Sequence, residues 1–383
     1  MTRREARMIF LLVLVLRIAV AAQFRGNFDS GSYLIVANAV LAGQNVYAVT
    51  DRYNYSPLWS YVVAGLWSAS APNVGLFVLL AGLFEVAVDT VTAWLLLRLA
   101  RDRMRFSPEE ARRAALLFYA NPVSVLISCA HGQFDGLSIL FLVAALFAAM
   151  GPERPGRRAG VVGFLSLSLL VKHITAFHAP LFWKRWRPGG LPAPLLAIPY
   201  VVFALSFVPF ASSSGSIAGN VLLYATWLAG PKRQRPGGPQ VVLRFAADPT
   251  IGYFLLFLAA VAAAVWIGRR LELPRACLLV FLALLVSLPG HANQYFVWPM
   301  ALGSLYASPG YAVCSTAAAL FLSGESLDLA WPVAVTIPGA WVAALVWFLA
   351  ELARALRGPR APASSEAAAL RAAVEAPAPS PAP

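Results

Sequence analysis

Charged residues are scarce in this sequence. Asp, Glu, Lys and Arg make up 12% of the 383 residues, whereas about a quarter of the residues of a soluble globular domain are charged. Hydrophobic residues make up 60% of the chain. The composition therefore excludes a soluble globular domain and indicates an integral membrane protein with many crossings.

Cysteines are few as well, and their positions exclude two classes of site. Cys129, Cys277 and Cys314 lie in or beside apolar segments and show no paired spacing. A disulfide framework and a metal site of the Cys/His type both require such spacing. We expect these three side chains to be small buried hydrophobic groups.

Acidic residues are outnumbered by basic ones. The chain has 30 Lys and Arg against 17 Asp and Glu, which gives a formal net charge of +13. In a membrane protein with many crossings, basic residues mark the cytoplasmic loops and contact anionic lipids. Membrane lipids are therefore expected partners, and nucleic acid is not.

The apolar segments predict the fold class. A helical crossing needs about 20 apolar residues, so the segments between Met8 and Ala350 provide for about ten to twelve crossings. We predict an all-α integral membrane bundle with one multi-span domain over residues 1–350. Residues 351–383 are rich in Ala and Pro and lack aromatic residues, which predicts a disordered cytoplasmic tail.

The distribution of arginines predicts the topology. Arg3, Arg4 and Arg7 precede the first apolar segment, and further arginines follow the last one, so both termini are expected in the cytoplasm. The first loop, residues 23–74, then lies outside. Its segment Leu58–Ser70 is short and rich in Trp and Tyr, as is typical of a helix that lies along the membrane surface.

With this topology, many polar side chains collect on the outer side of the membrane. They come from the first outer loop and from two later turns, which converge over the bundle. We therefore predict a polar cavity that faces the outer leaflet. The residues are Asp29, Asp51, His131, Gln133, Asp135, His291, Asn293 and Gln294.

Asp29 is the candidate catalytic residue. An isolated loop acid is more often a solvated carboxylate at the end of a helix. Here aromatic residues and glycines surround it, including Phe24, Gly26 and Phe28, which predicts partial burial. Burial raises the pKa of a carboxyl group toward the range of a general base.

The segment from His131 to Gly136 is the second candidate constellation. Together with Asn121-Pro122, it is explained in part by a helix kink followed by a polar turn in which Asp135 caps the next helix. Such a turn requires neither His131 nor Gln133. These two side chains are therefore candidates for substrate binding.

Acids and a lysine within apolar segments leave two alternatives open. Glu85 and Asp89 share one helix face, either as contacts to a neighbouring helix or as part of a site. Lys172, next to His173, either reaches the interface with its ammonium group or holds a phosphate.

A third polar turn follows near the end of the apolar region. His291, Asn293 and Gln294, with Tyr295 beside them, fit a solvated loop and also hydrogen bonding to a polyhydroxylated ligand.

The order of these motifs resembles the GT-C membrane glycosyltransferases over roughly residues 8 to 300. The first loop, including the run Tyr53-Asn54-Tyr55-Ser56-Pro57-Leu58, is similar to that of the GPI-type mannosyltransferases, and the turn His131-Gly132-Gln133-Phe134-Asp135 is similar to that of bacterial polyprenyl-phosphate-dependent relatives. Where the GPI-type enzymes have Asp-x-Asp, this chain has Asn27-Phe28-Asp29. The sequence thus assigns no metal ligands and no cofactor, and a requirement for a divalent metal stays open.

The resemblance implies transfer of a hexose, with mannose the leading candidate, from a polyprenyl-phosphate donor to a hydroxyl of a glycan or glycolipid acceptor. The reaction would take place with inversion on the extracytoplasmic side of a bacterial plasma membrane, with Asp29 as the general base. The residues expected to bind the donor or the acceptor are Asn27, Tyr53, Tyr55, His131, Gln133, Asp135, Lys172, His173, His291 and Gln294.

Two other functions compete with this hypothesis. A secondary transporter or lipid flippase would show inverted repeats and broken helices at mid-membrane. The sequence shows no internal repeat, and its polar groups are expected at one face of the membrane and not halfway across. An inactive GT-C relative that acts as an assembly factor is the other, because the first acid of the Asp-x-Asp pattern is missing.

Overall fold

The computed structural model describes residues 2–24, 26–187, 189–222, 250–288, 292–326 and 330–357. In this part of the chain the secondary structure is helical, with one isolated β-bridge between Trp183 and Leu191. The predicted all-α bundle is confirmed. The first half contains α1 (Arg3–Gln23), α2 (Phe28–Leu41), α3 (Val46–Val49), α4 (Pro57–Ser70), α5 (Val74–Asp102), α6 (Pro108–Tyr119), α7 (Pro122–Val125), η1 (Leu126–Ala130), α8 (Asp135–Ala149) and α9 (Arg157–Val171).

The second half continues the bundle with shorter and more broken helices. Its elements are η2 (His173–Phe182), α10 (Ala193–Ser206), η3 (Val208–Ser213), α11 (Ser214–Ile217), η4 (Ala218–Leu222), α13 (Thr250–Gly268), α14 (Leu273–Ser287), η7 (Asn293–Val297), α15 (Met300–Gly303), α16 (Pro309–Ser326) and α17 (Ala330–Leu356).

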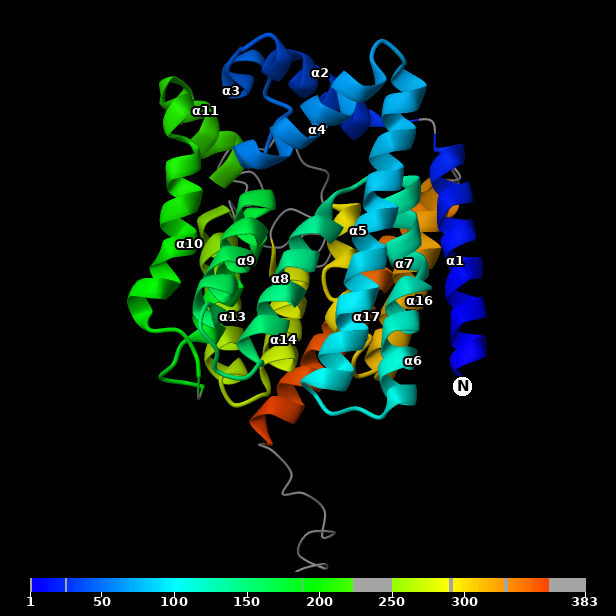
Figure 1. The fold of residues 1–383 in the computed structure, drawn as a ribbon, viewed down its shortest axis with the longest axis vertical. Helices are drawn as coiled ribbons and strands as arrows, with labels where there is room; N and C mark the ends of the chain where they lie inside the picture. Colours follow the sequence, from blue (N-terminus) through cyan, green and yellow to red (C-terminus); the bar gives the residue numbers. More distant parts are fainter. Residues whose placement is uncertain are drawn as a thin grey trace, which may run out of the picture.

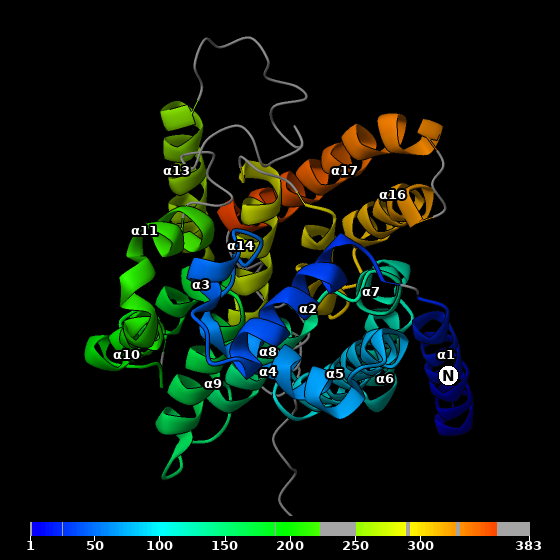
Figure 2. The ribbon, with the colours of Figure 1, turned by 90° about the horizontal axis from the view of Figure 1, so that it is seen from above.

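The longer helices stand side by side, and α2, α3 and α4 lie across one end of them (Figure 1). Seen from that end, α2 and α4 pass over the bundle between α9 and α5 (Figure 2). The predicted surface helix Leu58–Ser70 is α4, which belongs to this end layer. We call this end the capped end. α1 begins and α17 ends at the opposite end (Figure 1).

Several helices have the length and composition of membrane spans. α5 and the segment Ile337–Leu356 of α17 qualify as single helices among the described residues. Three bent pairs qualify when each is counted as one span, including α6 with Pro122–Ala130, which are bent by 43°. Shorter apolar helices, among them α8 and α14, complete the bundle.

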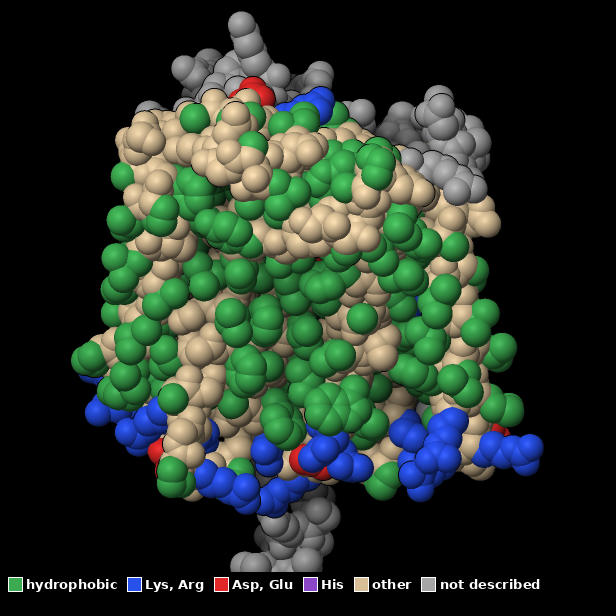
Figure 3. Space-filling view, turned by 45° about the horizontal axis from the view of Figure 1, so that its top comes forward, with side chains coloured by type: hydrophobic (Ala, Val, Ile, Leu, Met, Phe, Trp, Pro, Cys, Tyr) green, Lys and Arg blue, Asp and Glu red, His purple; other side chains and the backbone are tan. Residues whose placement is uncertain are grey.

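Side chains of like kind are segregated along the bundle. Hydrophobic side chains form a broad band around it, and Lys and Arg side chains gather along the rim away from the capped end (Figure 3). Exposed arginines at this rim include Arg3 at the start of α1, Arg101 at the end of α5 and Arg354 near the end of α17. A basic rim below an apolar band is the pattern of a membrane protein.

The helix breaks between α6 and α7 at Asn121-Pro122, and the contacts of Asn121 give this break a structural role. The proline ring carries no N–H for the helix ladder, and the N–H of Val123 turns to the Asn121 side-chain oxygen at 2.9 Å. The Asn121 amide nitrogen also donates to Tyr311 and Ser315 of α16, at 2.8 and 2.9 Å. At the predicted kink, Asn121 therefore also connects α16 to the centre of the bundle through these two hydrogen bonds.

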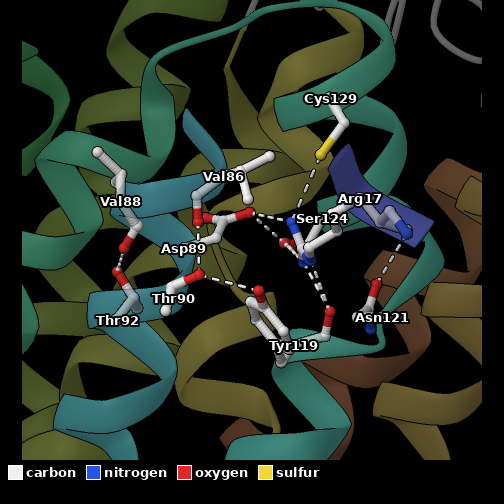
Figure 4. A network of polar contacts seen from close by, with 11 residues as sticks. Arg17, Val86, Val88, Asp89, Thr90, Thr92, Tyr119, Asn121, Ser124 and Cys129 are labelled. Carbon is white, nitrogen blue, oxygen red and sulfur yellow. Dashed lines mark hydrogen bonds and ion pairs between the residues drawn. The ribbon is translucent and has the colours of Figure 1, made fainter. Parts of the chain in front are cut away.

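The carbonyl of Tyr119, just before this break, accepts from a buried arginine. Nε and Nη2 of Arg17 in α1 donate to it at 2.9 and 2.7 Å. Nη1 of Arg17 lies 2.6 Å from the Asp89 carboxylate of α5, and Ser124 bridges the two ions (Figure 4). Both ionic side chains are fully buried. A buried charge is tolerated when it is paired and hydrogen-bonded, so this network holds α1 against α5 and α6.

Candidate active site

The candidate site is built around the turn 131–135, at the capped end of the bundle. One π-helical turn, η1, leads into it, and the N–H of His131 donates to the Leu126 carbonyl at 2.9 Å. Gly132 has a φ of +62°, and a Cβ at this position would lie 2.9 Å from the Phe24 ring. Both the backbone conformation and the close approach of Phe24 require glycine here.

Asp29 lies in the first turn of α2, against this turn. Asn27 caps α2 and forms a capping box with Ser30, which fixes the direction in which the helix begins. The amide nitrogen of Asn27 donates to the His131 carbonyl at 3.0 Å, and the amide nitrogen of Gln133 donates to Oδ2 of Asp29. Four of the predicted site residues are thus joined in two pairs, Asn27 with the backbone of His131 and Asp29 with the side chain of Gln133.

The environment of Asp29 raises its pKa above the ordinary value of an aspartate. Burial is the largest cause, because it disfavours the charged carboxylate. The hydrogen bond from Gln133 and the positive charges of Lys172 and His131 lower the pKa in part. The carboxyl group is therefore a stronger base than a solvated aspartate, and it still interacts with the positive charges of Lys172 and His131.

A cleft of about 750 Å³ opens beside Asp29. We call it the Asp29 cleft. It lies between the end of α1, the start of α2, the turn at His131 and the segment at Asn293. Its polar and aromatic lining includes Gln23, Asn27, Phe28, Asp29, His131 and Asn293.

Phe134 anchors the turn to the layer at the capped end. Its ring is fully buried and stacks on Trp59 of α4, with 3.8 Å between the ring centres and 13° between the planes. Tyr55 meets the ring edge-on at 4.6 Å, and Tyr33 of α2 does so at 6.0 Å. Aromatic pairs at these distances add to the stability of the packing, so the turn is held against the aromatic residues of the first outer loop.

Lys172 lies on the other side of the same turn. Its Nζ is 2.7 Å from Oδ1 of Asp135, and the side chain is 8% exposed. Trp298 donates from Nε1 to the same carboxylate oxygen at 2.5 Å. The ammonium group is 5.5 to 5.8 Å from the ring centres of Tyr55, Phe134, Tyr295 and Trp298. Aromatic faces attract a cation, so the charge of Lys172 is fixed in position.

A cavity of about 200 Å³ adjoins this ammonium group. We call it the Lys172 cavity. Its polar end has Lys172, His173, Asn54 and Gln294. The remainder is largely apolar, with Phe177, Phe254, Phe257, Leu258, Leu284 and Leu288 in its wall.

The predicted site residues divide between these two spaces. Asn27, Asp29 and His131 line the Asp29 cleft, and Tyr55, Lys172, His173 and Gln294 line the Lys172 cavity. The turn between the two spaces contacts both: Gln133 donates a hydrogen bond to Asp29, and Asp135 accepts one from Lys172. Tyr53 lines neither space: it is buried and donates its hydroxyl to the Ser56 carbonyl at 2.6 Å. His291 lies outside the described residues.

Sequence reasoning missed several residues that the structure brings into or beside the site. Trp298 bonds Asp135 across a separation of 163 residues, and Phe28 lines the Asp29 cleft with 65% of its side chain exposed. The sequence shows a phenylalanine next to the candidate base, but the 65% exposure of Phe28 is known only from the structure. In the described residues, no group of three His, Cys, Asp or Glu side chains is arranged to hold a metal, and the requirement for a divalent ion stays open.

Comparison with known proteins bears on the fold. No protein-family model matches the chain. GPI mannosyltransferase 1 of Aspergillus fumigatus is 27% identical over 168 residues, which cover 44% of this chain and 38% of that protein. This chain thus matches well under half the length of that relative.

Among solved structures, the chain is similar to ArnT from Cupriavidus metallidurans, whose crystal structure was determined bound to undecaprenyl phosphate. The TM-score is 0.57 at 13% identity, over 98% of this chain and 81% of the other. The similarity in fold thus extends over nearly the entire chain, although the sequence identity is low. The chain therefore has the same helical membrane fold as ArnT, which agrees with the fold that its sequence predicted.

Proposed function

We propose that this protein is a glycosyltransferase that moves a hexose from a polyprenyl-phosphate donor to a hydroxyl of a glycan or glycolipid acceptor, with inversion at the anomeric carbon. Mannose is the leading candidate for the hexose because the related fungal protein is named a mannosyltransferase. We place the reaction on the extracytoplasmic side of a bacterial plasma membrane, with both termini in the cytoplasm.

One observation carries this proposal: a candidate base and a buried cation flank the same short turn, and each faces its own space. Gln133 holds Asp29 at the Asp29 cleft, and Asp135 holds Lys172 at the Lys172 cavity. A reaction that joins two substrates needs two such spaces with their reactive ends close together.

The Lys172 cavity suits a donor that combines phosphate with an isoprenoid chain. Lys172 supplies a point charge for the phosphate, and the apolar wall accepts hydrocarbon. Leu222 and Leu258, also in this wall, are 51% and 37% exposed. The isoprenoid chain of the donor can therefore leave the cavity toward the lipid. The solved structure of ArnT, which contains undecaprenyl phosphate, agrees with this choice of ligand.

The transfer step needs few protein groups. The acceptor oxygen forms a bond to the anomeric carbon while the bond from that carbon to the phosphate oxygen breaks, and the polyprenyl phosphate leaves with the electron pair. Asp29 takes the proton of the acceptor hydroxyl. Lys172 offsets the negative charge that grows on the departing phosphate. Attack from the face opposite the phosphate inverts the anomeric centre.

The charge distribution supports the proposed orientation. The basic rim lies at the end opposite α2 and α4 (Figures 1 and 3), and an excess of Lys and Arg marks the cytoplasmic side. Asp29, at the start of α2, is then on the outer side.

The test is an assay of the purified protein with a panel of polyprenyl-phosphate hexoses and simple glycoside acceptors, with release of the free lipid phosphate as the readout. We expect Asp29→Asn to lower the rate by about 10²- to 10⁴-fold, the usual contribution of a general base, while donor binding is retained. Asp51→Asn is the matched control, because Asp51 is an exposed acid of the same outer loop that lines neither space.

The competing functions give other results in the same system. A transporter or flippase would move labelled sugar or lipid across liposome membranes without releasing the lipid phosphate. An assembly factor would do neither. Turnover that is unchanged in Asp29→Asn would refute the role of Asp29 as the base.

A further inference from the structure

We propose that the Asp29 cleft binds the acceptor as an uncharged saccharide, with a sugar ring placed against Phe28. This inference rests on the proposed function, since it names the acceptor class of the same site. It is carried by the exposure of Phe28, the amides around it, and the absence of Lys and Arg from the described lining of the cleft.

Phe28 is an exposed aromatic side chain at the wall of the Asp29 cleft. It precedes Asp29 in the first turn of α2, lines the cleft and is 65% exposed. The guanidinium carbon of Arg52 lies 4.0 Å from the ring centre, so the cation covers one face and steadies the ring. The exposed remainder of the ring is available to a ligand in the cleft. The electron-rich face of an aromatic ring attracts the positively polarised C–H groups of a sugar ring.

The other polar groups of the cleft match hydroxyl groups. Gln23, Asn27 and Asn293 line the cleft with amides. The Asn27 amide is engaged with Ser30 and with the His131 carbonyl, and a side-chain amide such as that of Gln23 has both a donor and an acceptor group. A hydroxyl group likewise donates and accepts, so an array of amides beside an aromatic ring suits a polyhydroxylated molecule. Asp29 stands at the same wall and would receive the proton of the reacting hydroxyl.

Electrostatics favours an uncharged ligand. Asp29 and His131 are the only Asp, Glu, Lys, Arg or His in the described lining of the Asp29 cleft. An anionic group bound beside Asp29 would be repelled by its carboxylate. Arg52 contacts the Phe28 ring but is not among the described lining residues of the cleft. The Lys172 cavity, by contrast, has a fixed cation. The two spaces therefore differ in the charge that they select, which keeps a phosphorylated donor out of the acceptor position.

The saccharide could reach the cleft from water or from the membrane. Ala19 and Val20 of α1 form part of the wall, next to Leu16 and Ile18, which are 53% and 41% exposed. The cleft thus borders an apolar face of α1 as well as the polar end layer. A free glycan and the head of a glycolipid have the same chemistry at Phe28, and the experiment separates them by the presence or absence of an alkyl chain.

The experiment uses the full-length protein in lipid nanodiscs with a matched set of glycosides. Octyl and methyl glycosides of glucose, mannose and galactose serve as acceptors, each alongside its 6-phosphate. The variants are Phe28→Ala, Phe28→Tyr and the control Tyr61→Ala. Tyr61 is a 55% exposed aromatic residue of α4 that lines neither space. Acceptor KM, donor KM and equilibrium binding of a tritiated octyl glycoside are measured.

We expect Phe28→Ala to raise the acceptor KM and weaken glycoside binding by about tenfold, which is the upper range for an aromatic contact. Donor KM should change much less, Phe28→Tyr should restore acceptor binding, and Tyr61→Ala should behave like the wild type. The 6-phosphates should bind at least tenfold more weakly than the uncharged glycosides. A preference for octyl over methyl glycosides would identify a membrane-anchored acceptor, and equal use would identify a free glycan.

Unchanged glycoside binding in Phe28→Ala, or equal binding of the 6-phosphates, would overturn this inference. The binding measurement needs no turnover. Phe28-dependent binding of uncharged glycosides without release of lipid phosphate from any donor would therefore refute the proposed function and leave the acceptor site standing.

Discussion

The hydrogen bond from Gln133 to Asp29 gives the sharpest test of the candidate base. Gln133→Ala removes the amide that donates to Oδ2 of Asp29, a contact that stabilises the ionised carboxylate. Burial already raises the pKa of Asp29. Without Gln133 the pKa should rise further, because only the charges of Lys172 and His131 then oppose burial and the nearby negative charge of Asp135.

The size of the effect follows from the kind of contact. A hydrogen bond to a charged group contributes about 1.5 to 3 kcal/mol when buried, and 1.36 kcal/mol corresponds to a change of one in pKa. Because Asp29 is only partly buried, the lower end of this range applies. We expect the pKa of Asp29 to rise in Gln133→Ala, by an amount that corresponds to the lower end of this free-energy range.

The assay is the pH dependence of kcat/KM for transfer, followed by release of the lipid phosphate. A general base acts in its deprotonated form, so the rate falls as the pH drops through the pKa of Asp29. The acidic limb of the Gln133→Ala profile should therefore lie at higher pH than that of the wild type. Gln23→Ala is the matched control, since Gln23 lines the same cleft but makes no side-chain hydrogen bond to Asp29 in the described structure.

An acidic limb that stays in place in Gln133→Ala would contradict the reasoning, provided that the variant folds and turns over. A uniform loss of rate at every pH would also count against it, because that result would assign to Gln133 a role in geometry alone. A shifted acidic limb and a uniform loss of rate give pH profiles of different shape. The profile therefore shows whether Gln133 acts on the pKa of Asp29 or only on its position.

Two further predictions concern the framework that holds the site, with thermal unfolding in detergent as the measurement. Gly132→Ala should destabilise the protein by about 1 to 2 kcal/mol, because an L-residue is strained at positive φ and its Cβ meets Phe24. Gly31→Ala, in α2 with open space around it, should be neutral or slightly stabilising, because alanine is the better helix former. Arg17→Met should cost about 3 to 5 kcal/mol by leaving Asp89 buried without its cation, and Arg17→Met with Asp89→Leu should recover much of this loss; an equal loss in both variants would refute the ion-pair explanation.

Much of the architecture could be predicted from local sequence. Apolar segment lengths and arginine positions predicted an all-helical bundle with a helix lying across one end at residues 58–70, and these features depend mainly on the immediate surroundings of each segment. The proximity of Asp29 to Gln133 also followed from topology, because the two loops were assigned to the same side of the membrane.

Pairings between distant residues could not be predicted in this way. Arg17 sits within an apolar run, and nothing in its neighbourhood indicates that its partner is Asp89, 72 residues later. Lys172 had two interpretations in the sequence, and the choice depends on Asp135, which lies 37 residues before it. Such contacts are set by how helices pack, and a single sequence does not record that packing.

In the proposed reaction, the turn 131–135 gives a structural reason why one carboxylate can suffice. Gln133 and Asp135 flank Phe134 and contact charged partners on its two sides, Asp29 and Lys172. Because the Phe134 ring is stacked on Trp59, one aromatic contact fixes both polar contacts together. In the proposed reaction, the base and the phosphate-binding cation are thereby set relative to each other by a single rigid element. With the leaving phosphate stabilised by Lys172, the chemistry left to the protein is the removal of one proton, and a second acid is not required for that step.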